Sequence, residues 1–350
     1  TANPATSAGF DFAIITVPTP LRETLPDLSF IESAAHDLSV HLTKGCTVVL
    51  ESTTYPGTTE SLMVPILEQG SGLKAGVDFF VGYSPERIDP GNTQYGFVNT
   101  PKVVAGIDDA SSEVICNLYG RLVDTVVPVS TPKEAELTKL LENTFRHVNI
   151  ALVNELAVFA RDLGIDVWEA IDAAATKPFG FMKFTPGPGV GGHCLPVDPS
   201  YLSWQVRRTL GHSFRFVELA NDVNEHMPDY VVQRLIAGLN QRKQALNGST
   251  VLLVGMSYKK NTGDDRESPA LRVAELLVGQ GCVLKAADPY VRQLRVDGVE
   301  LVELTAEAVD SADAIIILTD HDDFDYELVA NSPAYVLDTR RRLGGRRETL

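Results

Sequence analysis

The sequence lacks the features that would place the protein in a membrane or on a nucleic acid. Its 350 residues contain no apolar run of about 18 residues, the length that a transmembrane helix needs. No signal peptide with a charged start and a small-residue cleavage site is present. With a formal net charge of −16 at pH 7, the chain lacks the basic excess that nucleic acids and anionic membranes attract. We therefore expect a cytoplasmic protein that binds neither.

Closely spaced metal-binding cysteines are also missing. The four cysteines lie in separate segments, with no CxxC spacing between them: Cys46, Cys116, Cys194 and Cys282. Zinc knuckles and disulfide scaffolds both need paired or clustered cysteines, so we expect neither, and no metal.

The glycine fingerprint of a dinucleotide-binding domain is absent as well. An apolar run at residues 10–17 indicates a buried strand, but nothing before it has the form GxGxxG. Residues 1–8 read as the tail of a helix or a linker. Either the first domain is of another kind, or the sequence begins after an amino-terminal βαβ unit.

What is present is a strand–helix alternation at both ends of the chain, typical of doubly wound α/β domains. In the first part, expected strands at 10–17, 46–50 and 78–82 accompany an expected helix at 28–42. In the last third we expect a helix at 268–279 and strands at 250–254, 282–287, 314–318 and 335–337, with 335–337 as the last.

A long helix is predicted between these two parts. Thr131 to Glu134 form a capping box with proline at the first helical position, and apolar residues then recur at helical spacing until Gly164. A helix over 132–163 would span roughly 48 Å, enough to bridge domains and to offer a dimerisation face. Lys139 and Asn143 lie one turn apart on it, so they either enter one site together or form solvated surface.

The predicted fold class is therefore α/β. Two Rossmann-like doubly wound domains, the first of them incomplete, are joined by a helical central domain with a long bridging helix. We place the domains at residues 1–131, 132–243 and 244–350.

Two polar stretches follow expected strands, at the sheet edge where open α/β sheets bind ligands. Residues 51–59 are rich in hydroxyl groups that suit a phosphate or a nicotinamide carboxamide, although helix capping explains much of that pattern. Residues 83–92 contain Glu86, either an acid/base group or a surface ion-pair partner.

A glycine- and proline-rich stretch at 187–198 carries Cys194. Such a backbone can wrap closely on a ligand, which makes the thiol a candidate nucleophile, although an incidental cysteine in a loop is the alternative. Asp198 and the proline after it mark a helix start, whose dipole would favour a thiolate nearby. The aromatic and basic segment 177–184 just before could stack on a sugar or belong to the core.

The expected first turn of the last domain is basic rather than glycine-rich. Lys259 follows the strand at 250–254, and Arg340 follows the strand at 335–337. In so acidic a chain, cations at strand ends are what an anionic nucleotide needs.

Six motifs in one order resemble the UDP-glucose/GDP-mannose dehydrogenase family: VPTP (17–20), STTYPGTTE (52–60), SPERIDPGN (84–92), EAELTKLLEN (134–143), PGPGVGGHCLPVDP (186–199) and YKKNTGDDRESPAL (258–271). The stretch KPFGFMKFTPGPGVGGHC (177–194) most resembles the UDP-N-acetylglucosamine 6-dehydrogenase branch. Members carry a GxGxxG unit upstream, so the resemblance implies that the sequence starts after it.

The resemblance implies oxidation of a nucleotide sugar at C6, from alcohol to carboxylate, with two NAD used in succession. Cys194 would add to the aldehyde to form a thiohemiacetal, which is oxidised to a thioester and hydrolysed. Lys139 and Asn143 would hold the negative charge on the C6 oxygen. Asp198 would order a water or transfer a proton, Thr53 would place the reacting water, and Glu86 would be the acid/base for hydrolysis.

The remaining binding residues also follow from matching positions. The resemblance implies cofactor contacts from Pro18, Thr19, Ser52, Thr53 and Arg266. It implies substrate contacts from Glu86, Arg87, Lys139, Asn143, Phe179, Gly180, Phe184, Gly189, Gly191, Tyr258, Lys259 and Arg340.

Two departures and several alternatives remain. Pro90 stands where the UDP-glucose enzymes have a second glutamate, and without the fingerprint glycines we expect weak NAD binding. UDP-glucose or UDP-N-acetylmannosamine is an alternative substrate, and a UDP-sugar-binding fragment without catalysis is an alternative function. A homodimer or larger homo-oligomer and a role in polysaccharide precursor synthesis are expected.

Overall fold

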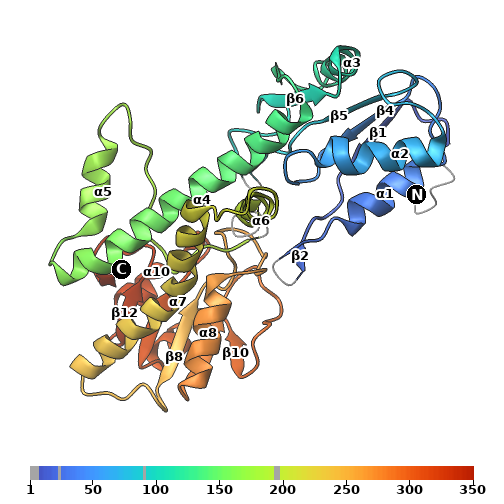
Figure 1. Ribbon diagram of the computed structural model, residues 1–350. Helices are drawn as coiled ribbons and strands as arrows, with labels where there is room; N and C mark the ends of the chain where they lie inside the picture. Colours follow the sequence, from blue (N-terminus) through green and yellow to red (C-terminus); the bar gives the residue numbers. More distant parts are fainter. Residues whose placement is uncertain (1–7, 23–24, 90–91, 193–197) are drawn as a thin grey trace. The chain divides into compact units, whose positions relative to one another are not determined.

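The computed structural model describes residues 8–22, 25–89, 92–192 and 198–350. The chain divides into two compact units, the first comprising residues 1–145 and 197–214 and the second residues 146–196 and 215–350. The boundary lies within the helix α4 (Pro132–Asp162), which the sequence predicted over 132–163. Figure 1 shows α4 as the longest helix of the chain.

The first unit is built on a five-stranded sheet in the order β1-β4-β5-β6-β7. Its strands are β1 (Phe12–Ile15), β4 (Thr47–Leu50), β5 (Phe80–Tyr83), β6 (Lys102–Gly106) and β7 (Val126–Pro128). A short hairpin of β2 (Leu21–Arg22) and β3 (Leu25–Pro26) follows β1. The helices are α1 (Ser29–Ser39), the π-helix η2 (Thr59–Met63), α2 (Val64–Ser71), α3 (Asp109–Tyr119) and α6 (Asp198–Leu210).

One strand departs from the parallel sheet expected for this unit. β6 runs antiparallel to β5, whereas β1, β4 and β5 are mutually parallel. The segment between β5 and β6 contains no helix among its described residues, and parallel strands need a crossover connection that is usually helical. This reversal brings the first residue of β6 to the edge of the sheet where β5 ends.

Alternating side chains of this sheet supply two cores. Val48, Leu50 and Val81 pack with α1 and α2 on one face, while Val49 and Val104 pack with α3 on the other. Figure 1 shows α1 and α2 lying side by side. The two-residue repeat of a strand explains this division, because successive side chains point to opposite faces.

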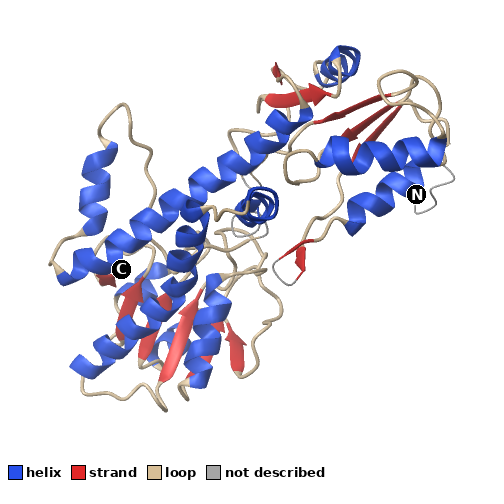
Figure 2. Cartoon of the chain, in the orientation of Figure 1, coloured by secondary structure: helices blue, strands red, loops and turns tan. Residues whose placement is uncertain are grey.

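The second unit contains a fully parallel sheet in the order β10-β9-β8-β11-β12-β13, drawn in red in Figure 2. The strands are β8 (Thr250–Val254), β9 (Val283–Ala287), β10 (Val299–Val302), β11 (Ala314–Ile317), β12 (Tyr335–Asp338) and β13 (Glu348–Thr349). This is the dinucleotide-fold order, whose switch point lies between β8 and β11. The prediction that 335–337 is the last strand was wrong, because the two-residue β13 is too short to carry a periodic pattern.

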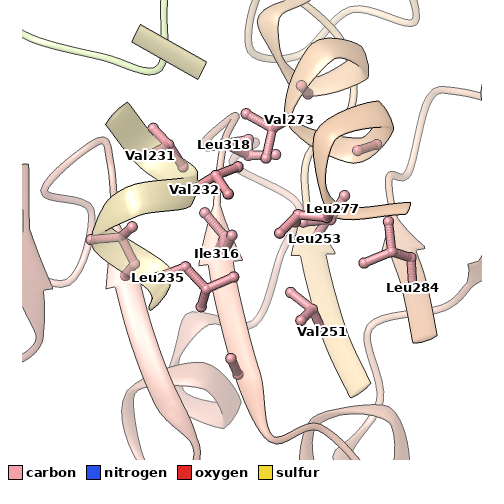
Figure 3. Packing of buried hydrophobic residues seen from close by; sticks show 14 of the residues in the cluster. Val231, Val232, Leu235, Val251, Leu253, Val273, Leu277, Leu284, Ile316 and Leu318 are labelled. Carbon is pink, nitrogen blue, oxygen red and sulfur yellow. The ribbon is translucent and has the colours of Figure 1, made fainter. Parts of the chain in front are cut away.

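Helices cover both faces of that sheet. They are α7 (Arg215–Gln241), α8 (Pro269–Gly279), α9 (Ala306–Asp310) and α10 (Tyr326–Ala330), whereas α5 (Val167–Ala175) packs against α4. Figure 3 shows Val231 and Leu235 of α7 and Leu277 of α8 packed over Leu253 and Ile316 of the strands. The opposite face packs with α9 and α10, so the predicted doubly wound architecture is confirmed. Among the described residues, no helix is long and apolar enough to cross a membrane.

Candidate functional site

In the first unit, one face of α4 carries three polar side chains that meet neighbouring elements. Glu136, Lys139 and Asn143 lie three and four residues apart, so they share that face. The Asn143 side-chain amide donates a hydrogen bond to the carboxylate of Asp198, the first residue of α6. Lys139 interacts electrostatically with the same carboxylate. The structure therefore brings Lys139 and Asn143 together with Asp198, which is 55 or more residues away from both in sequence.

Asp198 is 3% exposed, and its burial sets its protonation. Burial raises its pKa to about 6, against the lowering effects of the Lys139 charge and the Asn143 hydrogen bond. A carboxyl group that titrates near neutrality can either accept or release a proton at physiological pH, which suits an acid/base role.

The pH dependence of the protein's stability is expected to reflect the raised pKa of Asp198. The folded-state pKa of Asp198 lies above the ordinary value of 3.8. The stability that this carboxyl group contributes is therefore fully present below about pH 4 and is lost as pH rises through about 6. Relative to Asp198→Asn, which cannot titrate, the wild type should lose on the order of 3 kcal/mol between pH 4 and pH 7.5. Urea unfolding of both proteins at the two pH values measures this. If the free energies of unfolding of the two proteins changed equally with pH, the raised pKa of Asp198 would be contradicted.

Glu136 anchors the hydroxyl-rich loop that follows β4. Its carboxylate accepts hydrogen bonds from the Thr59 backbone N–H (2.9 Å), the Thr59 hydroxyl (2.7 Å) and the Gly57 backbone N–H. Glu136 is completely buried; burial raises its pKa to about 7, although the hydrogen bonds from Thr59 and Gly57 lower it. The sequence analysis missed this residue. Its place on the helical face of Lys139 and Asn143, one turn before Lys139, could have revealed it.

Four of the predicted cofactor-contact residues lie after two adjacent parallel strands. Pro18 and Thr19 follow β1, and Ser52 and Thr53 follow β4. The Ser52 hydroxyl donates to the Val17 carbonyl (2.7 Å), which ties the two loops together. Thr53 is half-buried, and its hydroxyl bonds to no other residue in the described part of the chain. An unengaged hydroxyl at this sheet edge fits the amide end of a nicotinamide cofactor.

Glu86 and Arg87 lie in the loop after β5 and have different partners. The Glu86 carboxylate accepts the Ile88 backbone N–H (2.5 Å) and lies 3.8 Å from the ammonium group of Lys102. Arg87 pairs with Glu142 of α4 (2.6 Å), one residue before Asn143. The loop is thus fastened to the candidate catalytic face of α4, while Glu86 remains 44% exposed.

In the second unit, residues 187–192 of the glycine-rich stretch pack tightly on protein. A Cβ added at Gly191 would lie 2.5 Å from the Glu267 carbonyl oxygen and 2.8 Å from the Tyr258 Cβ atom, and one at Gly187 would lie 2.7 Å from the Arg340 guanidinium. These glycines therefore allow close approach of the carboxyl-terminal domain. From the sequence, only contacts with substrate were expected for Gly189 and Gly191.

A buried chain of amides holds the start of this stretch. The Asn154 side chain of α4 accepts the Gly187 backbone N–H (2.9 Å) and donates to Asn224 of α7 (2.9 Å). Asn224 in turn lies 3.4 Å from the His147 ring, so α4 and α7 jointly position the backbone at Gly187. Neither asparagine stood out in the sequence, because a lone amide on a helix carries no motif.

Lys259 follows the carboxyl end of β8, which borders the switch point of the parallel sheet, and Arg340 follows that of β12, which lies beside β11. Arg340 donates to the Leu318 carbonyl (2.8 Å), and burial lowers its pKa. The loop of Lys259 is held by the buried His321, which accepts the Asn261 backbone N–H at Nδ1 (2.9 Å) and meets Asp288 at Nε2 (3.0 Å). Since Nδ1 accepts, the Nε2 proton points to Asp288.

The other predicted contacts have mixed surroundings. Phe179 is 71% exposed beneath the Lys177 ammonium group, and Gly180 is exposed with a positive φ of 67°. Phe184 packs against the core of α4 and α5, which favours the core alternative for this ring. Arg266 pairs with Asp264 through two nitrogens. Cys194 and Pro90 lie outside the described residues.

Comparison with known proteins identifies the family. Three domain models of the UDP-glucose/GDP-mannose dehydrogenase family match the chain: the NAD binding domain over residues 1–123, the central domain over 133–226 and the UDP binding domain over 252–344. The chain belongs to this family. The predicted resemblance, the fold and NAD as cofactor are thereby confirmed.

Individual dehydrogenases of the family are similar in sequence to this protein over most of its length. A UDP-N-acetyl-D-mannosamine dehydrogenase of Pyrococcus horikoshii is 38% identical over 90% of this chain and 72% of its own length. A UDP-N-acetyl-D-glucosamine 6-dehydrogenase of Pseudomonas aeruginosa is 39% identical over 79% of this chain and 66% of its own. A solved structure of the Pyrococcus enzyme has a TM-score of 0.86 at 35% identity, covering 97% of this chain and 79% of that one. The chain is therefore a nucleotide-sugar dehydrogenase of the oxidoreductase class.

Proposed function

We propose that the protein oxidises the C6 hydroxyl of a UDP-N-acetylhexosamine to a carboxylate, with UDP-N-acetylglucosamine as its best substrate. The observation that carries the proposal is the group of Lys139, Asn143 and Asp198 in the first unit. It combines a cation, an amide donor and a carboxyl group of raised pKa, which are the groups that alcohol and aldehyde oxidation require.

Each residue has a separate task in the proposed reaction. Bound NAD supplies the hydride acceptor for both oxidations. Lys139 and Asn143 stabilise the negative charge on the C6 oxygen, and Asp198 moves the proton or orders a water. Cys194 adds to the aldehyde carbon, and the thioester that follows is hydrolysed with Thr53 placing the water and Glu86 acting as acid/base.

The second unit would bind the nucleotide end of the substrate. Lys259 and Arg340 offer positive charge after the strands β8 and β12, where a diphosphate can be paired. Tyr258 and the glycines at 189 and 191 would enclose the sugar, and Phe179 and Gly180 would lie at its side. Pro18, Thr19, Ser52 and Arg266 would contact the cofactor.

The choice of sugar rests on the stretch 177–194, which most resembles the N-acetylglucosamine branch. The similar P. horikoshii enzyme bears the name of the N-acetylmannosamine substrate, and the P. aeruginosa enzyme that of N-acetylglucosamine. UDP-N-acetylmannosamine is therefore the second candidate.

The stoichiometry of NADH formation tests the proposal. We expect two NADH for each UDP-N-acetylglucosamine consumed, because one sugar is oxidised by four electrons in total. NADH absorbance and mass spectrometry of the sugar product measure this, with UDP-N-acetylmannosamine and UDP-glucose as comparison substrates. Binding of UDP-sugar without any NADH would instead favour the non-catalytic alternative. Activity confined to UDP-glucose would exclude the N-acetyl assignment.

We also propose three domains, with boundaries near residues 131 and 243.

We further propose that the protein is a homodimer or larger homo-oligomer. Large apolar side chains of α4 are exposed in both units. Within the first unit they recur every four residues at Leu137, Leu141 and Phe145, which is the spacing of a helical contact face.

A further inference from the structure

A buried lysine stands between two carboxylates at the end of the first unit's sheet. The Lys102 side chain is 5% exposed, and its ammonium group lies 3.0 Å from Glu51 and 3.8 Å from Glu86. It also donates to the Pro85 carbonyl (3.3 Å) and lies 5.2 Å from the centre of the Tyr119 ring. None of the roles proposed above involves this cation.

The reversal of β6 explains why Lys102 is there. Gly82 and Tyr83 at the end of β5 pair with Gly106 and Ala105 at the end of β6, so the start of β6 extends past β5 along the loop that follows it. The Ser84 hydroxyl accordingly bonds to the Val103 carbonyl (2.8 Å). A parallel β6 would have carried its first residue to the opposite end of the sheet.

A buried ammonium group requires fixed partners, because isolated charges inside a protein are strongly unfavourable. Glu51 is its nearer partner, 11% exposed and held in addition by the Tyr119 hydroxyl. Glu86 is the outer partner, 44% exposed. Lys102 thus joins the residue before Ser52 and Thr53 to the loop that carries Glu86.

We propose that Lys102 is a positioning residue that holds the Glu86 carboxylate in place for thioester hydrolysis. The role of Glu86 in hydrolysis rests on the proposed function. That Lys102 holds the Glu86 side chain in place does not depend on it. Lys102 touches no reacting atom in this scheme. It orients Glu86 by charge from within the sheet, while the Ile88 backbone N–H binds the other carboxylate oxygen.

The affected step is hydrolysis. Water adds to the thioester carbonyl carbon, Glu86 accepts a proton from that water, the carbon–sulfur bond breaks and Cys194 leaves as a thiolate. No electrons are exchanged in this step. Misplacing the base by about 1 Å can slow such a reaction on the order of 100-fold, without changing the oxidations that precede it.

The test is the double variant Lys102→Met/Glu51→Gln, which removes the cation and its buried counter-charge together. With UDP-N-acetylglucosamine and NAD, we expect a wild-type rate for the first NADH and turnover slowed roughly 10- to 100-fold. The thioester should accumulate as a covalent adduct on Cys194, detected by mass spectrometry. The single variant Lys102→Arg is the matched control, because it keeps the positive charge between Glu51 and Glu86. Its turnover should be much closer to that of the wild type than to that of the double variant.

Hydrogen exchange supplies a readout that needs no cofactor. Without Lys102, the Ile88 amide should exchange faster, because its acceptor Glu86 is no longer held. Lys74→Met, which removes an exposed lysine paired with Glu68, is the control and should change neither readout.

Equal slowing of the first NADH and of turnover, or wild-type behaviour of the double variant in both readouts, would overturn the inference. If the wild type forms no NADH and no adduct, the proposed function fails. Exchange at Ile88 then decides whether Lys102 positions Glu86.

Discussion

Replacing Cys194 by serine is expected to stop the reaction before the carboxylate forms. The proposed second oxidation requires a thiolate adduct, and a serine hydroxyl is a far weaker nucleophile at neutral pH. Formation of the uronic acid should fall by about three orders of magnitude or more, with at most one NADH for each sugar. Stopped-flow absorbance and product mass spectrometry measure both quantities.

Cys282→Ser is the matched control. Burial raises the pKa of the Cys282 thiol to about 11, so this cysteine is not a thiolate at neutral pH, and its replacement should leave turnover unchanged. Full carboxylate formation by the Cys194 variant would show that the covalent mechanism is wrong. Loss of activity in both variants would point to damage of the fold.

Replacing Glu136 by alanine is expected to have the largest effect on stability. The substitution leaves the buried N–H groups of Gly57 and Thr59 without their acceptor and opens space in the interior. The lost carboxyl group should cost about 3–5 kcal/mol of the free energy of unfolding near pH 4.5 and less at pH 8, because its pKa is raised from 4.5 to about 7 and its contribution is lost as pH rises through that value. Urea titration at the two pH values measures both losses.

The same variant should lose activity because the loop after β4 also carries Thr53. A displaced loop should lower kcat on the order of 10-fold or more, even where the variant is fully folded. Glu134→Ala is the control on the same helix. Glu134 is exposed and pairs with Thr131, so its removal should change stability little. Similar losses for the two glutamates would contradict a specific anchoring role for Glu136.

The local elements were predictable from the sequence because their signals are local. The capping box at Thr131–Glu134 located the start of α4, and apolar runs located β8 and β9 to within one residue. Helical spacing also placed Lys139 and Asn143 on one face. Six ordered motifs indicated the family from the sequence alone, because each keeps its residue types at fixed spacing.

Contacts between distant segments were not predictable in this way. Asn143 meets Asp198 across 55 residues, and Glu136 meets Thr59 across 77. Each partner by itself is an ordinary polar residue, so only the packing of α4 against the β4 loop and α6 reveals the pairs. The crowding around Gly191 is similar: the sequence indicates a backbone without side chains, but not which atoms fill the space.

The sequence by itself determined the family, the α/β architecture, the long helix and the set of candidate residues, because these follow from residue spacing within segments and from the order of motifs along the chain. The tertiary structure decided the strand direction of β6, and with it the burial of Lys102 between Glu51 and Glu86. It also decided the raised pKa values of Asp198 and Glu136. Burial and charge pairing depend on which segments meet in space, and no single segment encodes that.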